Sequence, residues 1–517
     1  MIPVIDLFAG PGGLGEGFSA FRSGKKNRFK IVLSIEKDPV AHNTLRLRSF
    51  FRQFSDRVPD DYYDLLRGKI SPEELYRRFP KEAAKAHDEA WLAVLGKPKE
   101  TSISEIDERI KKALGVAKKW VLIGGPPCQA YSLVGRSRMA GNKEKFEKDD
   151  RHFLYEEYLR IIAVHRPPVF VMENVKGILS SKVKGKLIID KILSDLKKPC
   201  ETNGIDVKGK HPTYDLHAFV HYGEDLPATG SLFSELDSDP SGYVIRAERH
   251  GIPQARHRLI LLGIRSDFHA SPTIVPVCEK TVAMWKVIGD LPEIRSKLSK
   301  EEDSVEAWVG SIKKVADLKC LPGDGIDIDV WRVMQKARKK LKESLRPGGE
   351  FISTDDRPKW QNAWFYDSRI GGVCNHSGRG HIAADLWRYF FAACFAKTRK
   401  KSPVLSDFPL HLLPKHRNAS PMESDESIDF SDRFRVQVKN RPSTTITAHI
   451  AKDGHYFIHP DPLQCRSLTV REAARLQTFP DNYFFLGPRT FQYQQVGNAV
   501  PPLLARKLAK VIHGLLK

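Results

Sequence analysis

Several features are scarce in this chain of 517 residues, and each scarcity excludes a class of protein. The seven cysteines are odd in number and lack C-x-x-C spacing, which argues against a disulfide framework and against a zinc cluster. No apolar run approaches the length needed to span a bilayer, and the first residues lack the basic region of a secretory signal. Internal repeats and low-complexity tracts are also missing. The sequence therefore predicts a cytoplasmic globular protein with reduced thiols and no membrane association.

Positive charge, by contrast, is in excess. The chain has 84 lysine and arginine residues against 63 aspartate and glutamate residues, which gives a net charge of +21. Its hydrophobic content of 41% is that of an ordinary globular protein, and its length allows roughly two to four domains. Such a charge favours a polyanionic partner, most simply nucleic acid.

The first residues predict the start of a nucleotide-type α/β fold. An apolar run at 4–8 leads into a glycine-rich turn and a helix, and a second apolar run at 31–35 ends in Glu36. A carboxylate in that position can accept hydrogen bonds from ribose hydroxyls. Because the glycines from Gly10 to Gly15 satisfy G-x-G-x-x-G, a dinucleotide-binding dehydrogenase is one interpretation. The acidic, proline-containing turn suits a ligand with ribose but no pyrophosphate better, and S-adenosylmethionine is such a ligand.

Two further predicted strands bring chemical groups to one edge of this sheet. The run at 120–123 is followed by two glycines, two prolines and Cys128, and the run at 168–172 is followed directly by Glu173. Ligands bind at this edge of open α/β sheets. Taken singly, a free cysteine is usually a small buried hydrophobe, and a glutamate after a strand usually compensates a helix terminus.

A hairpin is predicted next. Residues 243–245 can pair with 258–263 across a turn that carries Gln254, Arg256 and Arg258 at alternate positions. Alternation places the three side chains on one face, where they are either exposed to solvent or line a site for an anion or a base.

Two regions carry weaker signals. The segment 45–99 is charged and helical in period. Its basic positions Arg46, Arg48 and Arg52 could contact phosphate, but a solvated helix face is the favoured interpretation. In 267–464 the apolar periodicity weakens, and the glycine-rich stretch 367–381 is interpreted either as a DNA-reading loop or as a structural turn.

The C-terminal part again carries clear signals of secondary structure. Thr469, with Glu472 three residues later, predicts a capping box at the start of a helix. A last helix is predicted from the apolar stripe of Leu504, Leu508, Val511, Ile512 and Leu515.

Five motifs together carry a family likeness: DLFAG at 6–10, PPCQ at 126–129, ENV at 173–175, Q-x-R-x-R at 254–258 and GNAVPP at 497–502. In this order they resemble the DNA (cytosine-5) methyltransferases of bacterial restriction-modification systems, from the first residues of the chain to the last. The resemblance implies an α/β, Rossmann-like fold for S-adenosylmethionine-dependent methyl transfer, with a mixed sheet and helices on both faces. It also implies a separate, smaller target-recognition domain.

The same resemblance implies the domain boundaries. The catalytic, S-adenosylmethionine-binding domain is expected at 1–266, with 45–99 as a helical insertion. The target-recognition domain is expected at 267–464. Residues 465–517 are expected to complete the catalytic domain, with the last helix folding back beside the glycine turn.

The resemblance further implies a mechanism. The Cys128 thiolate adds to C6 of a cytosine, which makes C5 nucleophilic enough to take the methyl group. Glu173 holds the N3/N4 edge of the base, Arg258 holds O2, and Arg256 supports the site. A base inside a stacked duplex is out of reach, so base flipping is expected.

Residue assignments follow by likeness. Cofactor contacts are assigned to Phe8, Ala9, Gly10, Gly12, Leu14, Phe18, Glu36, Pro127, Asn498 and Val500. DNA or base contacts are assigned to Gln129, Ser132, Asn174 and Gln254, and no metal is expected. The acid that contacts the adenine amino group in this family should fall near residue 102, where Ser102 and Asp107 are alternatives.

The implied partner is double-stranded DNA. A restriction endonuclease that acts on the same site without direct contact is a further expected partner, and the enzyme is expected to be a monomer at the nucleoid. Two alternatives are an RNA (tRNA) cytosine-5 methyltransferase, whose small relatives usually lack so large a recognition block, and a catalytically inactive DNA-binding relative. The intact Cys128 and Glu173 argue against the inactive relative, and a dehydrogenase would leave both residues without a role.

Overall fold

The structure is a computed structural model that describes residues 1–127, 153–183, 185–205, 212–221, 239–314, 326–341, 344–414 and 431–517. These residues form two compact units. Unit 1 contains Met1–Val58, Tyr76–Lys280 and Ala499–Lys517. Unit 2 contains Pro59–Leu75 and Thr281–Asn498. Among the helices of these ranges, none combines the length and apolar character needed to cross a membrane.

Unit 1 is built on a mixed sheet, whose described strands number eight. Their order is β10 (Tyr214–Ala218), β13 (His257–Arg265), β7 (Val169–Val175), β6 (Val121–Gly124), β1 (Ile2–Leu7), β4 (Phe29–Glu36) and β5 (Ala90–Leu92), with β11 (Val244–Arg246) paired to β13. The strands from β7 to β5 are parallel, whereas β13 is antiparallel to β7, β10 and β11. The four predicted strands and the hairpin are therefore confirmed. The parallel strands read as apolar runs because both of their faces are covered.

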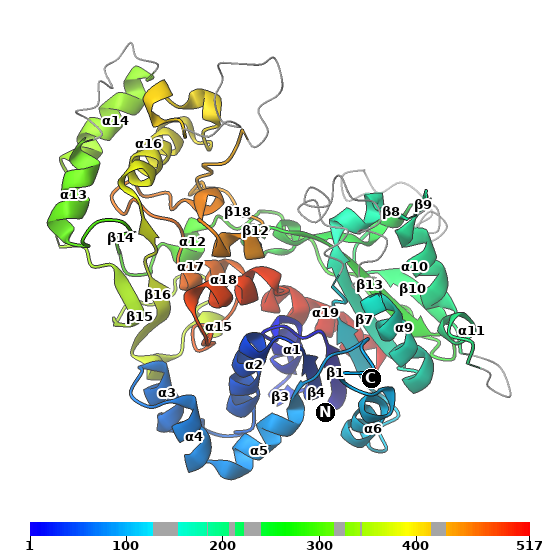
Figure 1. Cartoon of the computed structure of the whole chain (residues 1–517). Helices are drawn as coiled ribbons and strands as arrows, with labels where there is room; N and C mark the ends of the chain where they lie inside the picture. The colour runs from blue at the N-terminus through cyan, green and yellow to red at the C-terminus, as the bar shows by residue number, and fades with distance from the viewer. Residues whose placement is uncertain are drawn as a thin grey trace. The chain divides into compact units, whose positions relative to one another are not determined.

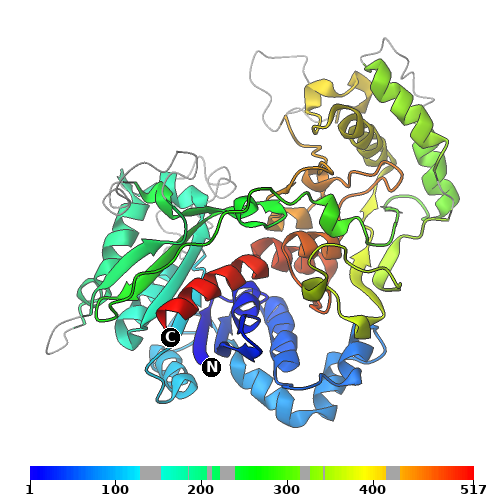
Figure 2. The same cartoon turned by 180° about the vertical axis from the view of Figure 1, so that it is seen from behind.

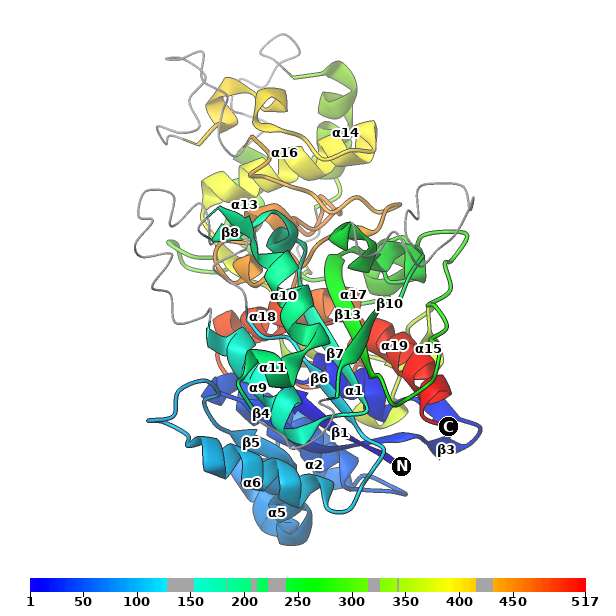
Figure 3. The same cartoon turned by 90° about the vertical axis from the view of Figure 1, so that its right-hand side faces the viewer.

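Helices cover both faces of this sheet (Figures 1 and 3). One face carries α6 (Ile103–Leu114), α9 (Phe153–His165) and α10 (Ile188–Lys197), and the other carries α1 (Gly13–Ser19) and α19 (Pro502–Leu515). On the first face Tyr158 and Ile192 join Leu7 and Phe170 in one apolar core. Together with the strand order, this arrangement confirms the predicted α/β class.

Glycine allows α1 and α19 to pack at very short distance (Figure 2). A Cβ atom on Gly13 would lie 2.3 Å from the carbonyl oxygen of Val500, and one on Gly17 would lie 2.4 Å from the Cβ of Ala505. Any larger residue would force the helices apart. The apolar stripe predicted for the last helix is buried, as expected.

The helices α2 (Pro39–Arg52) and α5 (Pro80–Glu89) lie within unit 1, and the side chains of Arg48 and Arg52 in α2 are largely buried. Arg48 donates to Glu16 at 2.8 Å, and Arg52 donates to Glu89 at 2.6 Å. Burial opposes the charge of Glu16, but Arg48 lowers its pKa below the usual value. The prediction of a solvated basic face was therefore wrong, because acids from α1 and α5 neutralise it.

Unit 2 has a helical layer and a set of short strands. Its remaining elements include α13 (Val305–Lys314), α14 (Ile328–Arg338), α16 (Ala383–Arg399), α17 (Val470–Leu476), α18 (Arg489–Asn498), the hairpin of β15 (Gly348–Ser353) with β16 (Gly372–Ser377), β18 (Ser443–Thr444) and α3 (Asp60–Leu66). Trp308 of α13, Met334 of α14 and Phe391 of α16 share one apolar core.

Helix α3 is anchored to the stretch 367–381. The hydroxyl of Tyr63 donates to Asp367 at 2.8 Å, and Nε of Arg67 donates to the carbonyl of Ile370 at 3.1 Å. The following residues form β16, whose central side chains are buried. These contacts favour the interpretation of 367–381 as a structural turn and strand.

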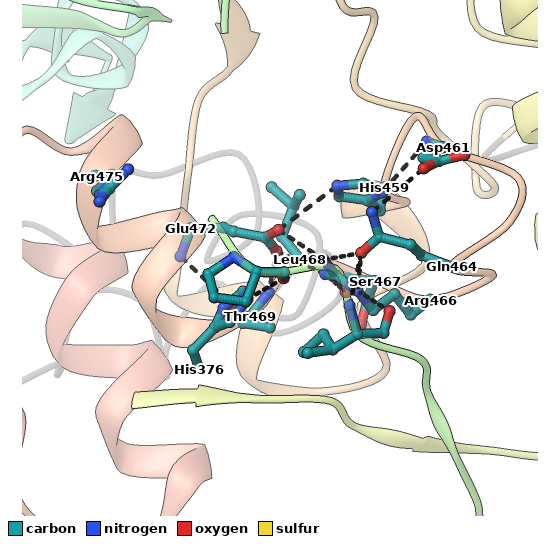
Figure 4. A network of polar contacts seen from close by, with 12 residues as sticks. His376, His459, Asp461, Gln464, Arg466, Ser467, Leu468, Thr469, Glu472 and Arg475 are labelled. Atoms are coloured by element: carbon teal, nitrogen blue, oxygen red, sulfur yellow. Dashed lines mark hydrogen bonds and ion pairs between the residues drawn. The ribbon is translucent and has the colours of Figure 1, made fainter. Parts of the chain in front are cut away.

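A buried polar network surrounds the start of α17 (Figure 4). Thr469 and Glu472 form the predicted capping box, which is confirmed. Arg466 donates to both carboxylate oxygens of Glu472 at 2.7 Å. His459 lies 3.5 Å from the same carboxylate, and Nδ1 of His376 lies 2.9 Å from the hydroxyl of Thr469. The network therefore combines one fully neutralised ion pair with two buried histidines.

These histidines predict that unit 2 loses stability in mild acid. Burial lowers the pKa of His376 to about 4 and that of His459 to about 3, so both are neutral in the folded chain near neutral pH. In the unfolded chain they protonate near pH 6.5, as free histidine does. Between about pH 6.5 and 4 the unfolded chain thus binds more protons, and each histidine should lower the free energy of unfolding by up to roughly 1.4 kcal/mol per pH unit.

Urea unfolding monitored at several pH values in this window measures the slope. His376→Gln should make the dependence shallower, because one titrating group is removed. Although burial opposes its charge, Arg466 holds the pKa of Glu472 well below its usual range, so Glu472 stays ionised and does not offset the trend. A stability that is flat over this window would contradict the prediction.

Candidate active site

The described part of the site is built from the ends of β6, β7 and β13. Three predicted site residues, Cys128, Gln129 and Ser132, lie outside the described residues. Pro127, directly before Cys128, is half-buried. The surroundings of that proline therefore define the described wall of the site.

Strand register brings Glu173 and Arg258 together. Arg258 of β13 is paired with Val175 of β7, two residues beyond Glu173 on the same face. A long side chain can reach such a diagonal neighbour. Nε of Arg258 lies 2.9 Å from Oε1 of Glu173, and each side chain is only 13% exposed. The site thus holds a carboxylate and a guanidinium in contact.

A second cation lies close to this pair. Arg256 is 1% exposed, and burial together with Arg258 lowers its pKa well below the usual value, whereas Glu173 acts in the opposite direction. Burial likewise lowers the pKa of Arg258. Because arginine stays protonated in proteins, two guanidinium groups face one carboxylate. The surplus positive charge favours an anionic sulfur or a carbonyl oxygen nearby.

The turn before Cys128 is tied to the end of β7. A Cβ atom on Gly125 would lie 2.9 Å from Oε2 of Glu173, so any larger residue would displace that carboxylate. Asn174 is buried, and its Nδ2 donates to the carbonyl of Pro126 at 3.3 Å, while its Oδ1 accepts from the backbone N–H of Val175 at 2.8 Å. Asn174 therefore holds the turn in place beside Glu173. Gln254, two residues before Arg256, is completely buried.

A second group of predicted residues surrounds the glycine turn. Oε2 of Glu36 accepts from the backbone N–H of Gly10 at 2.7 Å, and Oε1 accepts from Asp38 N–H at 2.7 Å. Burial raises the pKa of Glu36, and these backbone donors oppose that effect. Phe8 and Gly12 both have positive φ angles, 56° and 97°, which a non-glycine residue such as Phe8 rarely adopts.

Some of the predicted cofactor residues lie at the glycine turn, and others lie elsewhere in the structure. Ala9 donates to the carbonyl of Ile35, and the backbone of Val500 lies against Gly13, beside the turn. Leu14 is buried at the start of α1. Phe18 lies in the core, where its ring packs edge-on against Phe29 at 5.3 Å. Asn498 belongs to unit 2.

The two alternatives for the adenine contact both have structural roles. Ser102 caps α6 by accepting from a backbone N–H of its first turn. Asp107 accepts from Arg160 at 3.0 Å and lies 2.9 Å from His165.

Strand β5 was missed in the sequence. It pairs with β4 beside Glu36, and Ala93 donates to the carbonyl of Glu36 at 3.1 Å. Thr101 lies close to the residues after β5, because its hydroxyl accepts from Val94 N–H at 3.1 Å. Three residues inside a helical insertion give no periodic signal that could have revealed this strand.

Comparison with known proteins decides the family. A family model described as C-5 cytosine-specific DNA methylase matches residues 79–199 and 222–514. The chain belongs to this family. The methylase is 31% identical to the type II methyltransferase M.Bpa9945I of Bacillus paralicheniformis over 538 residues, which cover 99% of each chain. It is 26% identical to M.DdeI of Desulfomicrobium norvegicum, over 98% of this chain and 88% of the relative. It is 27% identical to M.AgeI of Thalassovita gelatinovora, over 98% of both.

The methylase is thus a DNA (cytosine-5) methyltransferase with relatives of the restriction-modification type. The dehydrogenase interpretation of the glycine turn is excluded by this membership. Within the described ranges, no three His, Cys, Asp or Glu side chains are grouped so that they could hold a metal ion.

Proposed function

We propose that this methylase modifies C5 of a cytosine flipped out of duplex DNA, with Cys128 as the covalent nucleophile. The observation that carries the proposal is the Glu173–Arg258 pair at the end of β7, held against the turn that leads into Cys128. Few arrangements other than recognition of a polar ring edge would require a buried carboxylate and two guanidinium groups here.

The proposed steps use these residues in order. The Cys128 thiolate, favoured by the surplus positive charge, forms a bond to C6 of the base. Glu173 accepts from the N4 amino group and holds a proton at N3, so that electron density moves to C5. Arg258 donates to O2, and Arg256 and Gln254 keep Arg258 in place. After methyl transfer, C5 loses its proton to a base and the C6–sulfur bond breaks, which restores the thiolate.

The glycine turn fits S-adenosylmethionine as the methyl donor. Each oxygen of Glu36 accepts one backbone N–H and keeps a lone pair that can accept from a ribose hydroxyl. The glycines at 10 and 12 leave no side chain in the way of a ligand. When bound there, S-adenosylmethionine supplies the methyl group. We assign Phe8, Ala9, Gly10, Gly12 and Glu36 to this site, with Val500 and Pro127 along its wall.

For the rest of the chain we propose that residues 267–464 recognise the target sequence. We further propose that the enzyme acts as a monomer on nucleoid DNA in the cytoplasm, beside a restriction endonuclease of the same specificity. The type II names of its relatives support the endonuclease partner in this proposal.

A transfer assay tests the function. Purified enzyme with methyl-labelled S-adenosylmethionine should label cytosine C5 in duplex DNA and leave RNA unlabelled. Bisulfite sequencing of DNA from an expressing host should then show methylation at one recurring sequence. Labelling of RNA without DNA would overturn the proposal in favour of an RNA methyltransferase.

A further inference from the structure

Unit 2 contains a pocket of about 280 Å³ that none of the proposed steps uses. Its lining begins two residues after the end of α16 and includes Thr444 of β18. Its lining comes from three short stretches, which are residues 401–404, residues 432 and 435–438, and residues 441, 442 and 444.

Positive charge dominates this pocket. Lys401, Arg435 and Arg441 contribute three cations, and Asp432 contributes one anion, so the net charge is +2. Asp432 is already paired with Arg435. Lys401 and Arg441 are exposed, and neither side chain has a hydrogen bond or an ion pair with any other described residue. Two cations are therefore available to a ligand.

The polar groups that shape the wall are, in contrast, already engaged. Gln437 is 1% exposed, and its Oε1 accepts from Thr444 N–H at 2.9 Å. Its Nε2 donates to the hydroxyl of Thr444 at 3.0 Å and to the carbonyl of Tyr456 at 2.9 Å. Ser402 accepts from the backbone N–H of Val436 at 3.0 Å. The wall is thus preformed, and it offers few free donors or acceptors of its own.

The rest of the lining is apolar. It consists of Pro403, Val404, Val436, Val438 and Pro442. Side chains of this kind suit the carbon skeleton of a sugar, and they offer no hydrogen-bond donor or acceptor to a base edge.

We propose that this pocket holds one backbone nucleotide of duplex DNA, with its phosphate between Lys401 and Arg441 and its deoxyribose against the apolar wall. The proposal rests on the function proposed above and adds a contact that fixes the position of DNA on unit 2. Because the buried amide and hydroxyl groups are used within the wall, the pocket positions the backbone without reading sequence. Basic side chains that neutralise phosphates release counterions, so the contact should appear in the salt dependence of binding.

Binding of the full-length enzyme to a fluorescent duplex, measured over a range of salt concentrations, tests the proposal. Arg441→Ala and Lys401→Ala should each reduce the slope of log affinity against log salt by about 0.9. Each variant should weaken binding by the same factor for duplexes with and without the methylated sequence. Arg441→Lys should keep the slope. Lys359→Ala, which removes an exposed charge of unit 2 that does not line the pocket, should keep it as well.

Thermal melting should be unchanged in all four variants, since the replaced side chains are exposed. An unchanged slope in Arg441→Ala and Lys401→Ala would overturn the proposal, and so would a loss confined to the cognate sequence. A second measurement uses free deoxycytidine monophosphate. If this nucleotide binds the wild-type enzyme at micromolar concentration, and if the variants leave the salt dependence of duplex binding unchanged, the pocket binds a free nucleotide and the proposal is overturned. Failure of the wild-type enzyme to methylate DNA would instead refute the proposed function, whatever the slopes.

Discussion

Replacing Glu173 by glutamine should lower kcat for methyl transfer by about a hundredfold to ten-thousandfold, the usual range for loss of a positioned acid–base group. Glutamine has the shape of glutamate and can still hydrogen-bond the base, but it carries no charge. It cannot stabilise a proton at N3 as the ring becomes electron-rich. It also removes the negative charge that lies 2.9 Å from the buried guanidinium of Arg258 in the native site.

Single-turnover methyl transfer, with DNA affinity measured in parallel, checks this expectation. Cys128→Ser should abolish turnover and therefore serves as the negative control of the assay. Glu248→Gln is the matched control, because Glu248 contacts His257 at 2.8 Å, one residue from Arg258, and has no proposed contact with the base. Gly125→Ala should also reduce kcat, since its Cβ would displace the Glu173 carboxylate. A normal kcat in Glu173→Gln would refute the role given to this residue.

Replacing Glu472 by glutamine should destabilise unit 2 by about 3–5 kcal/mol, which is the usual cost of leaving a buried charge unpaired. Arg466 is 1% exposed and directs two nitrogens at the Glu472 carboxylate. The amide would keep at most one of these contacts in good geometry, and the guanidinium would remain charged and dry. The same change weakens the capping box at the start of α17.

The midpoint of urea unfolding measures this effect, followed by a probe of tertiary structure. Glu301→Gln, a change of the same chemistry at an exposed position of unit 2, should alter the free energy of unfolding by no more than about 0.5 kcal/mol. Equal midpoints for the two variants would show that the Arg466–Glu472 pair adds nothing to stability.

The sequence predicted those parts of the fold that have short-range signals. The apolar runs of β1, β4, β6 and β7 are readable because each strand is buried on both faces. The capping box of Thr469 and Glu472 is readable because both partners lie within one helical turn. The motif residues Glu173 and Arg258 could be named, and the strand register then explains why they meet.

What could not be predicted depends on partners that are distant in the sequence. Arg48 reads as a solvated helix residue until Glu16, 32 positions earlier, is placed against it. Tyr63 carries no sign of its partner Asp367, which is 304 positions away. Strand β5 was hidden for a different reason, because three residues are too few to show a period.

The anchoring of α3 has a consequence for how specificity can be exchanged between relatives. Unit 2 is encoded by two separate stretches of the chain, Pro59–Leu75 and Thr281–Asn498. A recombination event that moved only the second stretch would bring a foreign partner to Tyr63 and Arg67, which hold the turn before β16. With the recognition role proposed for 267–464, inheritance of a new specificity should therefore favour crossovers that carry Pro59–Leu75 along, and a designed chimera should transplant this short stretch together with 267–464.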